Sequence, residues 1–199
     1  MVAMFYLFVT PLTPPNRPGW GGRGYIPRWR LNLVNEADSP KPPAGKSPEA
    51  SAAEMMELVL PNDANLLGNC LGGRVMYLID IAGFLAASRH CGRTVVTASM
   101  DSLDFREPIR VGEAVVVQAR VNYAGRTSVE VEVRVLAENL AAGRRRPTCT
   151  AYVTYVALDG EGRPAPVPPV IPSTDADRER YRAAGERRRE RLRRLGRLE

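Results

Sequence analysis

The sequence predicts an α+β fold in which an antiparallel sheet curls around one long buried helix. Residues 72–90 form a helical segment that is apolar on nearly every side, and a helix that is hydrophobic all round is a buried helix. Two segments that follow it, 115–123 and 126–136, alternate apolar and polar residues, as strands with one buried face do. With 199 residues, 44% of them apolar, the chain can bury such a core.

The remaining strands are predicted from shorter apolar runs. They cover residues 53–60, 94–105 and 148–158. Ala124-Gly125 is expected to make the tight turn between the two alternating segments. One strand before the helix and four after it give a single sheet, and the proline-rich residues 164–172 connect this sheet to a last helix.

Composition divides the chain into three parts. Residues 1–48 hold nine of the 17 prolines, and we expect this extension to be disordered because it has no periodic pattern. The folded domain is expected over 49–172, followed by an Arg/Glu-rich helix over 173–199. The net charge of +6 equals the surplus of residues 178–199 in this helix, which hold ten Arg against four Glu. The basicity is therefore a property of one tail.

Several kinds of site and segment are excluded. The three cysteines form no C-x-x-C pair, and His90 is the only histidine, which argues against disulfides, a zinc site and a Ser-His-Asp triad. No G-x-S-x-G elbow or Walker loop is present. No apolar stretch reaches the roughly 18 residues of a bilayer span, and the N-terminus lacks the features of a signal peptide. We therefore expect a metal-free, cytoplasmic protein that does not enter a membrane.

Asp80 is the one charged residue within the apolar stretch 75–87. A buried carboxylate costs several kcal/mol unless it is paired or its pKa rises, so Asp80 is either a hydrogen-bonded structural residue or a functional one. Gly72-Gly73 open the helix, where free N–H groups can hold a developing oxyanion. Close packing against a strand is the alternative explanation for these glycines.

Asn65 lies just before them, and the run PNDANLLGNCLGGRVMYLIDIAG resembles the signature of the hotdog-fold cytosolic acyl-CoA hydrolases. That signature has a P-x-D-A-N turn, then G-N-x-x-G-G, then an acidic residue in the helix. The resemblance continues through RHCGRTVVTASMDSLDF, GRTSVEVEVRVLAENL and VPPVIPSTDADRERYRAAGERRRERL, and it covers about residues 54–192. It implies a hotdog fold, in which the antiparallel sheet wraps round the long central helix, with the basic helix at the C-terminus.

The resemblance also implies an acyl-CoA thioesterase that hydrolyses fatty acyl-CoA to free acid and CoA. Its site would use Asn65 of one subunit and Asp80 of another, with the Gly73 N–H polarising the thioester carbonyl. Asp80 would act as a general base on water or as a nucleophile. Coenzyme A enters only as part of substrate and product, and no separate cofactor is expected. Self-association as a dimer or as a hexamer, a trimer of dimers, follows from the same resemblance.

Coenzyme A contacts are implied at two strand segments and on the C-terminal helix. They fall on Ala98, Ser99, Met100, Thr127, Ser128, Val129 and Arg189. Ordinary strand-edge polarity explains Thr127 and Ser128 equally well, and a solvated helix explains most of the arginine-rich tail.

Two other functions compete with the thioesterase. A hotdog-fold dehydratase or hydratase would pair a histidine with an acid, but His90 lies ten residues beyond Asp80. A non-enzymatic acyl-CoA-binding or nucleic-acid-binding hotdog protein would use the arginine-rich tail for phosphates. We expect acyl-CoA as the partner and no nucleic acid, and we assign neither His90 nor Cys70 a catalytic role.

Overall fold

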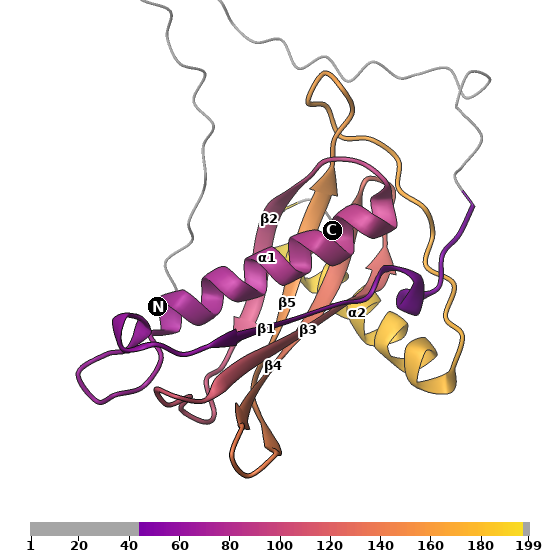
Figure 1. Ribbon diagram of the computed structural model, residues 1–199. Coiled ribbons are helices and arrows are strands. Elements are labelled where there is room, and N and C mark those ends of the chain that lie inside the picture. Colours follow the sequence, from indigo (N-terminus) through magenta and orange to yellow (C-terminus); the bar gives the residue numbers. More distant parts are fainter. Residues whose placement is uncertain (1–43, 197–199) are drawn as a thin grey trace, which may run out of the picture. The chain divides into compact units, whose positions relative to one another are not determined.

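The computed structural model describes residues 44–196, which form one five-stranded antiparallel sheet and two long helices (Figure 1). The strands are β1 (Ala53–Leu58), β2 (Val95–Leu103), β3 (Ala114–Ala124), β4 (Ser128–Asn139) and β5 (Arg144–Ala157). The helices are α1 (Gly72–Cys91) and α2 (Asp175–Arg194), with short 3-10 turns at Pro48–Ser51 and Pro61–Asp63. The strand order β1-β3-β4-β5-β2 leaves β1 and β2 at the two edges. This arrangement is the predicted hotdog fold.

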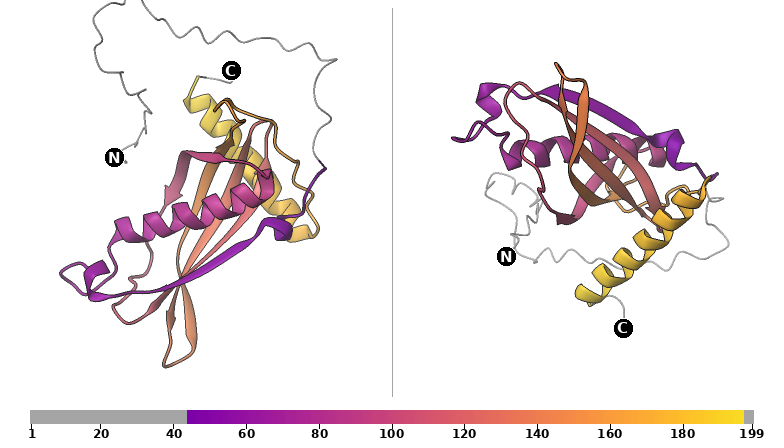
Figure 2. Two further views of the ribbon diagram at one scale, coloured as in Figure 1. Left: turned by 45° about the horizontal axis from the view of Figure 1, so that its top comes forward. Right: turned by 90° about the horizontal axis from the view of Figure 1, so that it is seen from below.

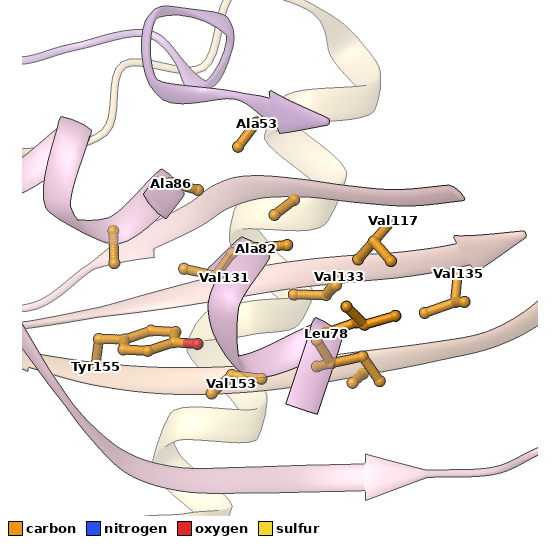
Figure 3. Packing of buried hydrophobic residues seen from close by; sticks show 14 of the residues in the cluster. Ala53, Leu78, Ala82, Ala86, Val117, Val131, Val133, Val135, Val153 and Tyr155 are labelled. Carbon is orange, nitrogen blue, oxygen red and sulfur yellow. The ribbon is translucent and has the colours of Figure 1, made fainter. Parts of the chain in front are cut away.

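Helix α1 packs across the inner face of the sheet, and the core lies between them (Figure 3). Leu78, Ile79, Ala82 and Ala86 of α1 are each at most 2% exposed. They meet the inward row of β4, which is Val129, Val131, Val133 and Val135. The predicted alternation therefore describes the strand correctly, with its apolar side turned to the helix.

Helix α2 lies on the opposite face of the sheet (Figures 1 and 2). There the outward residues of the strands include two buried carboxylates, Glu130 and Glu132. Arg187 binds Glu130 at 2.6 Å and stacks on the Tyr152 ring at 3.6 Å. Arginine side chains from α2 thus neutralise acids that the alternating strand turns away from the core.

Further ion pairs join α2 to the sheet along its whole length. They are Asp177 with Arg120, Arg180 with Glu132, and Arg191 and Arg194 with Asp101. Since the partners belong to β3, β4 and β2, the helix crosses most of the sheet. The proline-rich connector returns the tail to the domain, and several of its arginines are paired rather than solvated. In the described part of the chain, neither long helix is apolar enough to cross a membrane.

The predicted elements agree with the structure, with small shifts at their ends. The β3–β4 connection is a three-residue loop, 125–127, closed by the Gly125 N–H donating to the Ser128 carbonyl at 2.8 Å, and not a turn at Ala124-Gly125. β5 also begins earlier than predicted, at Arg144. Most of the expected N-terminal extension, residues 1–43, lies outside the described residues.

The last residues of that extension contact the domain. The Lys46 N–H donates to the Pro169 carbonyl at 3.0 Å, and the Lys46 carbonyl accepts from the Ile171 N–H at 2.9 Å. The Lys46 ammonium group donates to the carbonyls of Arg89 and His90 at 2.9 and 2.8 Å. A cation at this position favours the end of α1, where backbone carbonyls have no helical partner.

Candidate active site

Asp80 lies in the middle of α1, where two strands contact the helix. Its carboxylate oxygen Oδ1 accepts a hydrogen bond from the Thr97 hydroxyl at 2.7 Å. The Tyr155 hydroxyl donates to the Asp80 main-chain carbonyl at 2.9 Å and lies 3.4 Å from Oδ1. Thr97 and Tyr155 are directly paired across β2 and β5. The sheet therefore presents two hydroxyls side by side to one carboxylate.

Tyr155 reaches the helix from within the core, where it is fully buried (Figure 3). Gly83, one turn after Asp80, makes room for it, because a methyl group at Gly83 would overlap the Tyr155 hydroxyl. Burial raises the pKa of Tyr155, and the nearby Asp80 carboxylate adds to this effect. Tyr155 therefore stays protonated at neutral pH and acts as a hydrogen-bond donor to the Asp80 segment.

Strand β2 has a bulge beside this contact. Its pairing with β5 shifts between Thr97 and Ser99, so that Ala98 has no partner in the ladder. A second shift follows between Asp101 and Leu103, where Ser102 has a φ of 45°. Bulges re-aim side chains and often lie next to active sites. Here the first one separates Thr97, which faces Asp80, from the segment expected to contact coenzyme A.

Asn65 lies in the exposed loop before α1. Its side-chain oxygen Oδ1 accepts hydrogen bonds from the Leu67 N–H at 2.9 Å and the Asn69 N–H at 3.2 Å. These two bonds fix the amide orientation, and the Nδ2 group makes no hydrogen bond within residues 44–196. The arrangement leaves an N–H donor available to a substrate oxygen.

A pocket of about 330 Å³ brings Asn65 together with the start of α1. Its lining includes Asn65, Gly72, Phe105 and Ile109. The helix begins at Gly72 with no side-chain cap, and the first N–H groups of a helix have no helical acceptor. A side chain added at Gly73 would meet no other atom within 4 Å, so the space beside this first turn of the helix is open.

Asp80 is not part of this pocket. Gly73 and Asp80 are seven residues apart, or about 10 Å along the helix axis. Met76, Tyr77 and Phe84, which neighbour Asp80 on the helix surface at spacings of three and four residues, are 40–55% exposed. Within one chain, therefore, Asn65 and the helix start lie together, and Asp80 lies apart on an apolar face.

The residues predicted to contact coenzyme A lie close together in the sheet. Ser99 and Glu130 both pair with Thr154 of β5, so the segments 98–100 and 127–129 are two strands apart, or about 10 Å. Val129 is 1% exposed and packs in the core, so this residue offers little surface to a ligand. The Ser99 hydroxyl is buried and has no hydrogen-bond partner among the described residues.

Arg189 lies apart from these segments, on the exposed side of α2. Arg187 and Arg191 face the sheet through Glu130 and Asp101, and Arg189 is about 200° around the helix from Arg187. Arg188 instead reaches the β3–β4 loop, since its guanidinium would lie 3.3 Å from a side chain at Gly125. Arg188 is thus the arginine of α2 next to the segment 127–129.

Thr97 and Tyr155 are site residues that sequence reasoning missed. Tyr155 carried a detectable signal, because it interrupts an inward row of small and apolar residues (Cys149, Ala151, Val153, Ala157), and buried tyrosines need a partner for their hydroxyl. Thr97 carried none, since threonine is common in strands. Only the register of β2 on β5 shows that it meets Asp80.

His90 lies at the far end of α1 from the pocket and is fully buried. Its Nε2 is 2.9 Å from the Pro168 carbonyl, and its Nδ1 is 3.4 Å from the Ser51 hydroxyl. Burial lowers the pKa of this imidazole. These contacts place His90 where the connector joins the domain, away from Asp80. Within residues 44–196 no three His, Cys, Asp or Glu side chains are grouped to hold a metal ion.

Comparison with known proteins places this arrangement in a family. The Thioesterase superfamily matches residues 67–143. The uncharacterized acyl-CoA thioester hydrolase YkhA of Bacillus subtilis is 41% identical over 133 residues, which are 67% of this chain and 77% of that protein. The cytosolic acyl coenzyme A thioester hydrolase of Mus musculus is 33% identical over 157 residues, 77% of this chain. The chain spans only 40% of the length of that mouse protein.

Solved structures agree with both the fold and the family. A hexameric acyl-CoA thioesterase is 41% identical with a TM-score of 0.74, and the match covers 76% of this chain and 97% of that one. An acyl-CoA hydrolase of Staphylococcus aureus in complex with butyryl coenzyme A and coenzyme A is 37% identical with a TM-score of 0.71, covering 76% and 93%. Variants of the staphylococcal enzyme carry alanine for an asparagine, an aspartate and a threonine, spaced by 15 and then 17 residues.

Proposed function

Because the chain belongs to the thioesterase superfamily, and within it to the hotdog-fold acyl-CoA hydrolases, we propose that it hydrolyses fatty acyl-CoA to a free acid and CoA with Asp80 as the reacting carboxylate. The observation that best supports this role is the pair of hydroxyls, Thr97 and Tyr155, that hold Asp80 on an otherwise apolar helix face. A carboxylate retained and oriented at such a position is typical of a functional site.

Two routes are compatible with this geometry. As a general base, Asp80 takes a proton from water while the water oxygen attacks the thioester carbonyl carbon. As a nucleophile, Asp80 attacks that carbon itself, and water then cleaves the resulting mixed anhydride. In both routes the C–S bond breaks, the electron pair leaves with sulfur, and one water is consumed. The Gly73 N–H stabilises the carbonyl oxygen in the transition state, which such a donor does by about 3–4 kcal/mol.

The spacing of the three residues replaced in the staphylococcal variants supports a role for the same three residue types in this chain. Asn65, Asp80 and Thr97 are separated by 15 and 17 residues, as the three replaced residues are in that enzyme. We assign Thr97 the role of orienting the Asp80 carboxylate through its 2.7 Å hydrogen bond. Asn65, whose Oδ1 is already engaged by its own loop, would donate from Nδ2 to the thioester oxygen or to the attacking water.

The complete site would combine two subunits. In one chain, the pocket with Asn65 and Gly72 does not include Asp80, and the apolar side chains around Asp80 are exposed. A partner that covers this face would bring its own Asn65 loop toward Asp80. The hexameric state of a 41% identical thioesterase supports a hexamer, and a trimer of dimers would hold six such sites.

Coenzyme A would bind along the segments 98–100 and 127–129, with its phosphates near α2. The arginines of α2 that pair with Glu130, Glu132 and Asp101 are already neutralised, which argues against a free basic surface for nucleic acid. Of the remaining arginines of α2, Arg188 and Arg189 are our candidates for the phosphates. We keep the cytoplasm as the expected location, as the name of the mouse relative suggests for that protein.

Release of free thiol from a panel of acyl-CoA substrates tests this function and defines the acyl-chain preference. Asp80→Asn should fold, bind CoA and lose turnover by roughly 10²-fold or more, because it removes only the base or nucleophile. Asp104→Asn, a change of the same kind at an exposed residue, is the control and should keep wild-type kcat. Wild-type kcat in Asp80→Asn would rule out this mechanism, and binding of CoA without turnover in the wild type would favour a sensor.

A further inference from the structure

We propose that Arg146 is a positioning residue of the thioesterase site, holding the loop that forms one wall of the pocket and sets the conformation of the Asn65 segment. This role rests on the proposed function of Asn65. Arg146 lies on β5, outside the pocket lining and outside the segment that resembles the family signature. It would therefore act through the loop and not by contact with substrate.

Arg146 forms a clamp across the loop that joins β2 to β3. Its guanidinium donates to both oxygens of Glu113, at 2.7 and 2.8 Å, and to the Pro108 carbonyl at 2.7 Å. Glu113 also accepts the Arg110 N–H at 2.9 Å. One guanidinium thus closes residues 108–113 into a fixed turn. The Glu113 side chain is 12% exposed, and its hydrogen bonds from Arg146 hold its pKa below the usual value.

The clamped turn is joined directly to the Asn65 segment by main-chain hydrogen bonds. The Cys70 N–H donates to the Ile109 carbonyl at 2.6 Å, and the Val111 N–H donates to the Gly68 carbonyl at 3.1 Å. Asn69 and Arg110 form an isolated antiparallel bridge between these two bonds. The loop that carries Asn65 is therefore hydrogen-bonded to the turn that Arg146 holds in place.

The same turn also forms a wall of the pocket. Residues 105–109, which lead into this turn, line the pocket together with Asn65 and Gly72. The Phe105 ring is 3.6 Å from where a side chain at Gly72 would lie, so this wall is close to the first turn of α1. Movement of the clamped turn would change the width of the pocket and the position of the Asn65 amide together.

The chemistry of the clamp requires arginine. Its planar guanidinium has five N–H donors and can bind a carboxylate with two parallel bonds while a third bond goes to a carbonyl. Lysine would keep the charge and lose this geometry. Small displacements of positioning groups lower rates strongly, by up to about a hundredfold for 1 Å.

Neighbouring Arg145 provides a matched control. It also lies on β5 and pairs with carboxylates, Glu138 at 2.8 Å and Glu54 at 3.9 Å. Those partners belong to β4 and β1, and none of them is in the loop. Arg145→Gln and Arg146→Gln therefore remove the same charge and a comparable number of ion pairs, but only the second releases the turn.

The test compares thioesterase kinetics, thermal unfolding and amide hydrogen exchange for wild type, Arg145→Gln, Arg146→Gln and Arg146→Lys. In Arg146→Gln, kcat should fall by roughly tenfold or more, and exchange should accelerate in peptides covering 64–72 and 105–113. Arg145→Gln should keep kcat and exchange in these peptides at wild-type values. Arg146→Lys should have kcat and exchange rates between those of the wild type and Arg146→Gln.

Unchanged exchange in these peptides for Arg146→Gln would overturn the proposal, as would equal effects of the two glutamine variants. Faster exchange with unchanged kcat would also overturn it while leaving the thioesterase function intact. A wild-type protein without turnover would instead remove the proposed function, and the positioning role with it.

Discussion

At the scale of single residues, the site depends on how Thr97 and Tyr155 meet Asp80. Tyr155 is fully buried and spans from β5 to the helix, where its hydroxyl donates to the Asp80 carbonyl at 2.9 Å. Such an approach needs a helix residue without a side chain, and Gly83 fills this position. The glycine therefore has a packing role that is specific to the site.

Gly83→Ala should destabilise the protein and lower kcat. In most helices the change from glycine to alanine stabilises by about 1 kcal/mol, but here the new methyl group would displace the Tyr155 hydroxyl and disturb Asp80. Gly185→Ala on α2 is the matched control, because its methyl group would make an ordinary contact, 3.7 Å from the Tyr123 ring. Thermal unfolding and kcat measure both. A stabilised, fully active Gly83→Ala would contradict the role given to Tyr155.

Arg188 and Arg189 of α2 should differ in their effect on coenzyme A. Arg188 lies beside the β3–β4 loop and Arg189 points away from it. If CoA phosphates bind at that loop of the same chain, Arg188→Ala should raise KM for acyl-CoA by about tenfold with little change in kcat, since a charge-assisted hydrogen bond contributes roughly 1.5–3 kcal/mol. A larger effect of Arg189→Ala would instead place the phosphates on the outer side of α2.

An acyl-pantetheine substrate lacks the nucleotide, so it distinguishes an arginine that binds phosphate from one with a structural role. Its KM should not respond to either arginine substitution. An equal rise of KM for both substrates would mean that the substituted arginine is structural and does not bind phosphate.

At the scale of elements, α2 is attached to the sheet by several ion pairs, one of which is deeply buried. The Glu130 side chain is 1% exposed, and among residues 44–196 its only cationic partner within hydrogen-bonding distance is Arg187. Burial raises the pKa of Glu130 even though the Arg187 guanidinium favours its ionised form. This pair therefore controls whether the acidic outer face of β4 can remain buried under the helix.

Arg187→Ala should be strongly destabilising, by about 3–5 kcal/mol at pH 7, because it leaves a buried carboxylate without a counter-charge. A raised folded-state pKa makes the folded protein bind the proton more tightly than the unfolded chain does. The loss of stability in Arg187→Ala should therefore be small near pH 4. It should grow as the pH rises above about 4.3, the pKa of an unfolded glutamate. Urea unfolding across this range measures it.

The double variant Arg187→Ala with Glu130→Gln should recover much of the lost stability, because no uncompensated charge remains. A double variant no more stable than Arg187→Ala would show that the stacking of Arg187 on Tyr152, and not the ion pair, holds the helix.

The same elements show what sequence reasoning could and could not find. The valines of β4 and the apolar surface of α1 have periodic patterns, so the sheet, the buried helix and their order were predictable. Asn65, Asp80 and Gly73 were predicted through a local signature of consecutive residues. Thr97, Tyr155 and Arg146 were not, because their roles depend on strand register and on contacts between residues that are 17 to 75 positions apart.

At the scale of the whole molecule, the proposed site requires more than one chain. The pocket beside Asn65 and the carboxylate of Asp80 lie at different places on α1. Met76, Tyr77 and Phe84 around Asp80 are 40–55% exposed, and an apolar face of this kind marks an interface in proteins that associate. A dimer in which each subunit supplies Asn65 to the other would cover this face and complete two equivalent sites.

Subunit complementation tests whether Asn65 and Asp80 of different subunits form one site. Asn65→Ala and Asp80→Asn homo-oligomers, each prepared inactive, are mixed, dissociated, reassembled and assayed for thiol release. Random pairing in dimers should restore about a quarter of the wild-type activity, because half of the dimers are mixed and one of their two sites contains both intact residues. Recovery to this level is the predicted result. Reassembled mixtures that remain as inactive as the separate variants, in oligomers shown to exchange subunits, would contradict a site shared between chains.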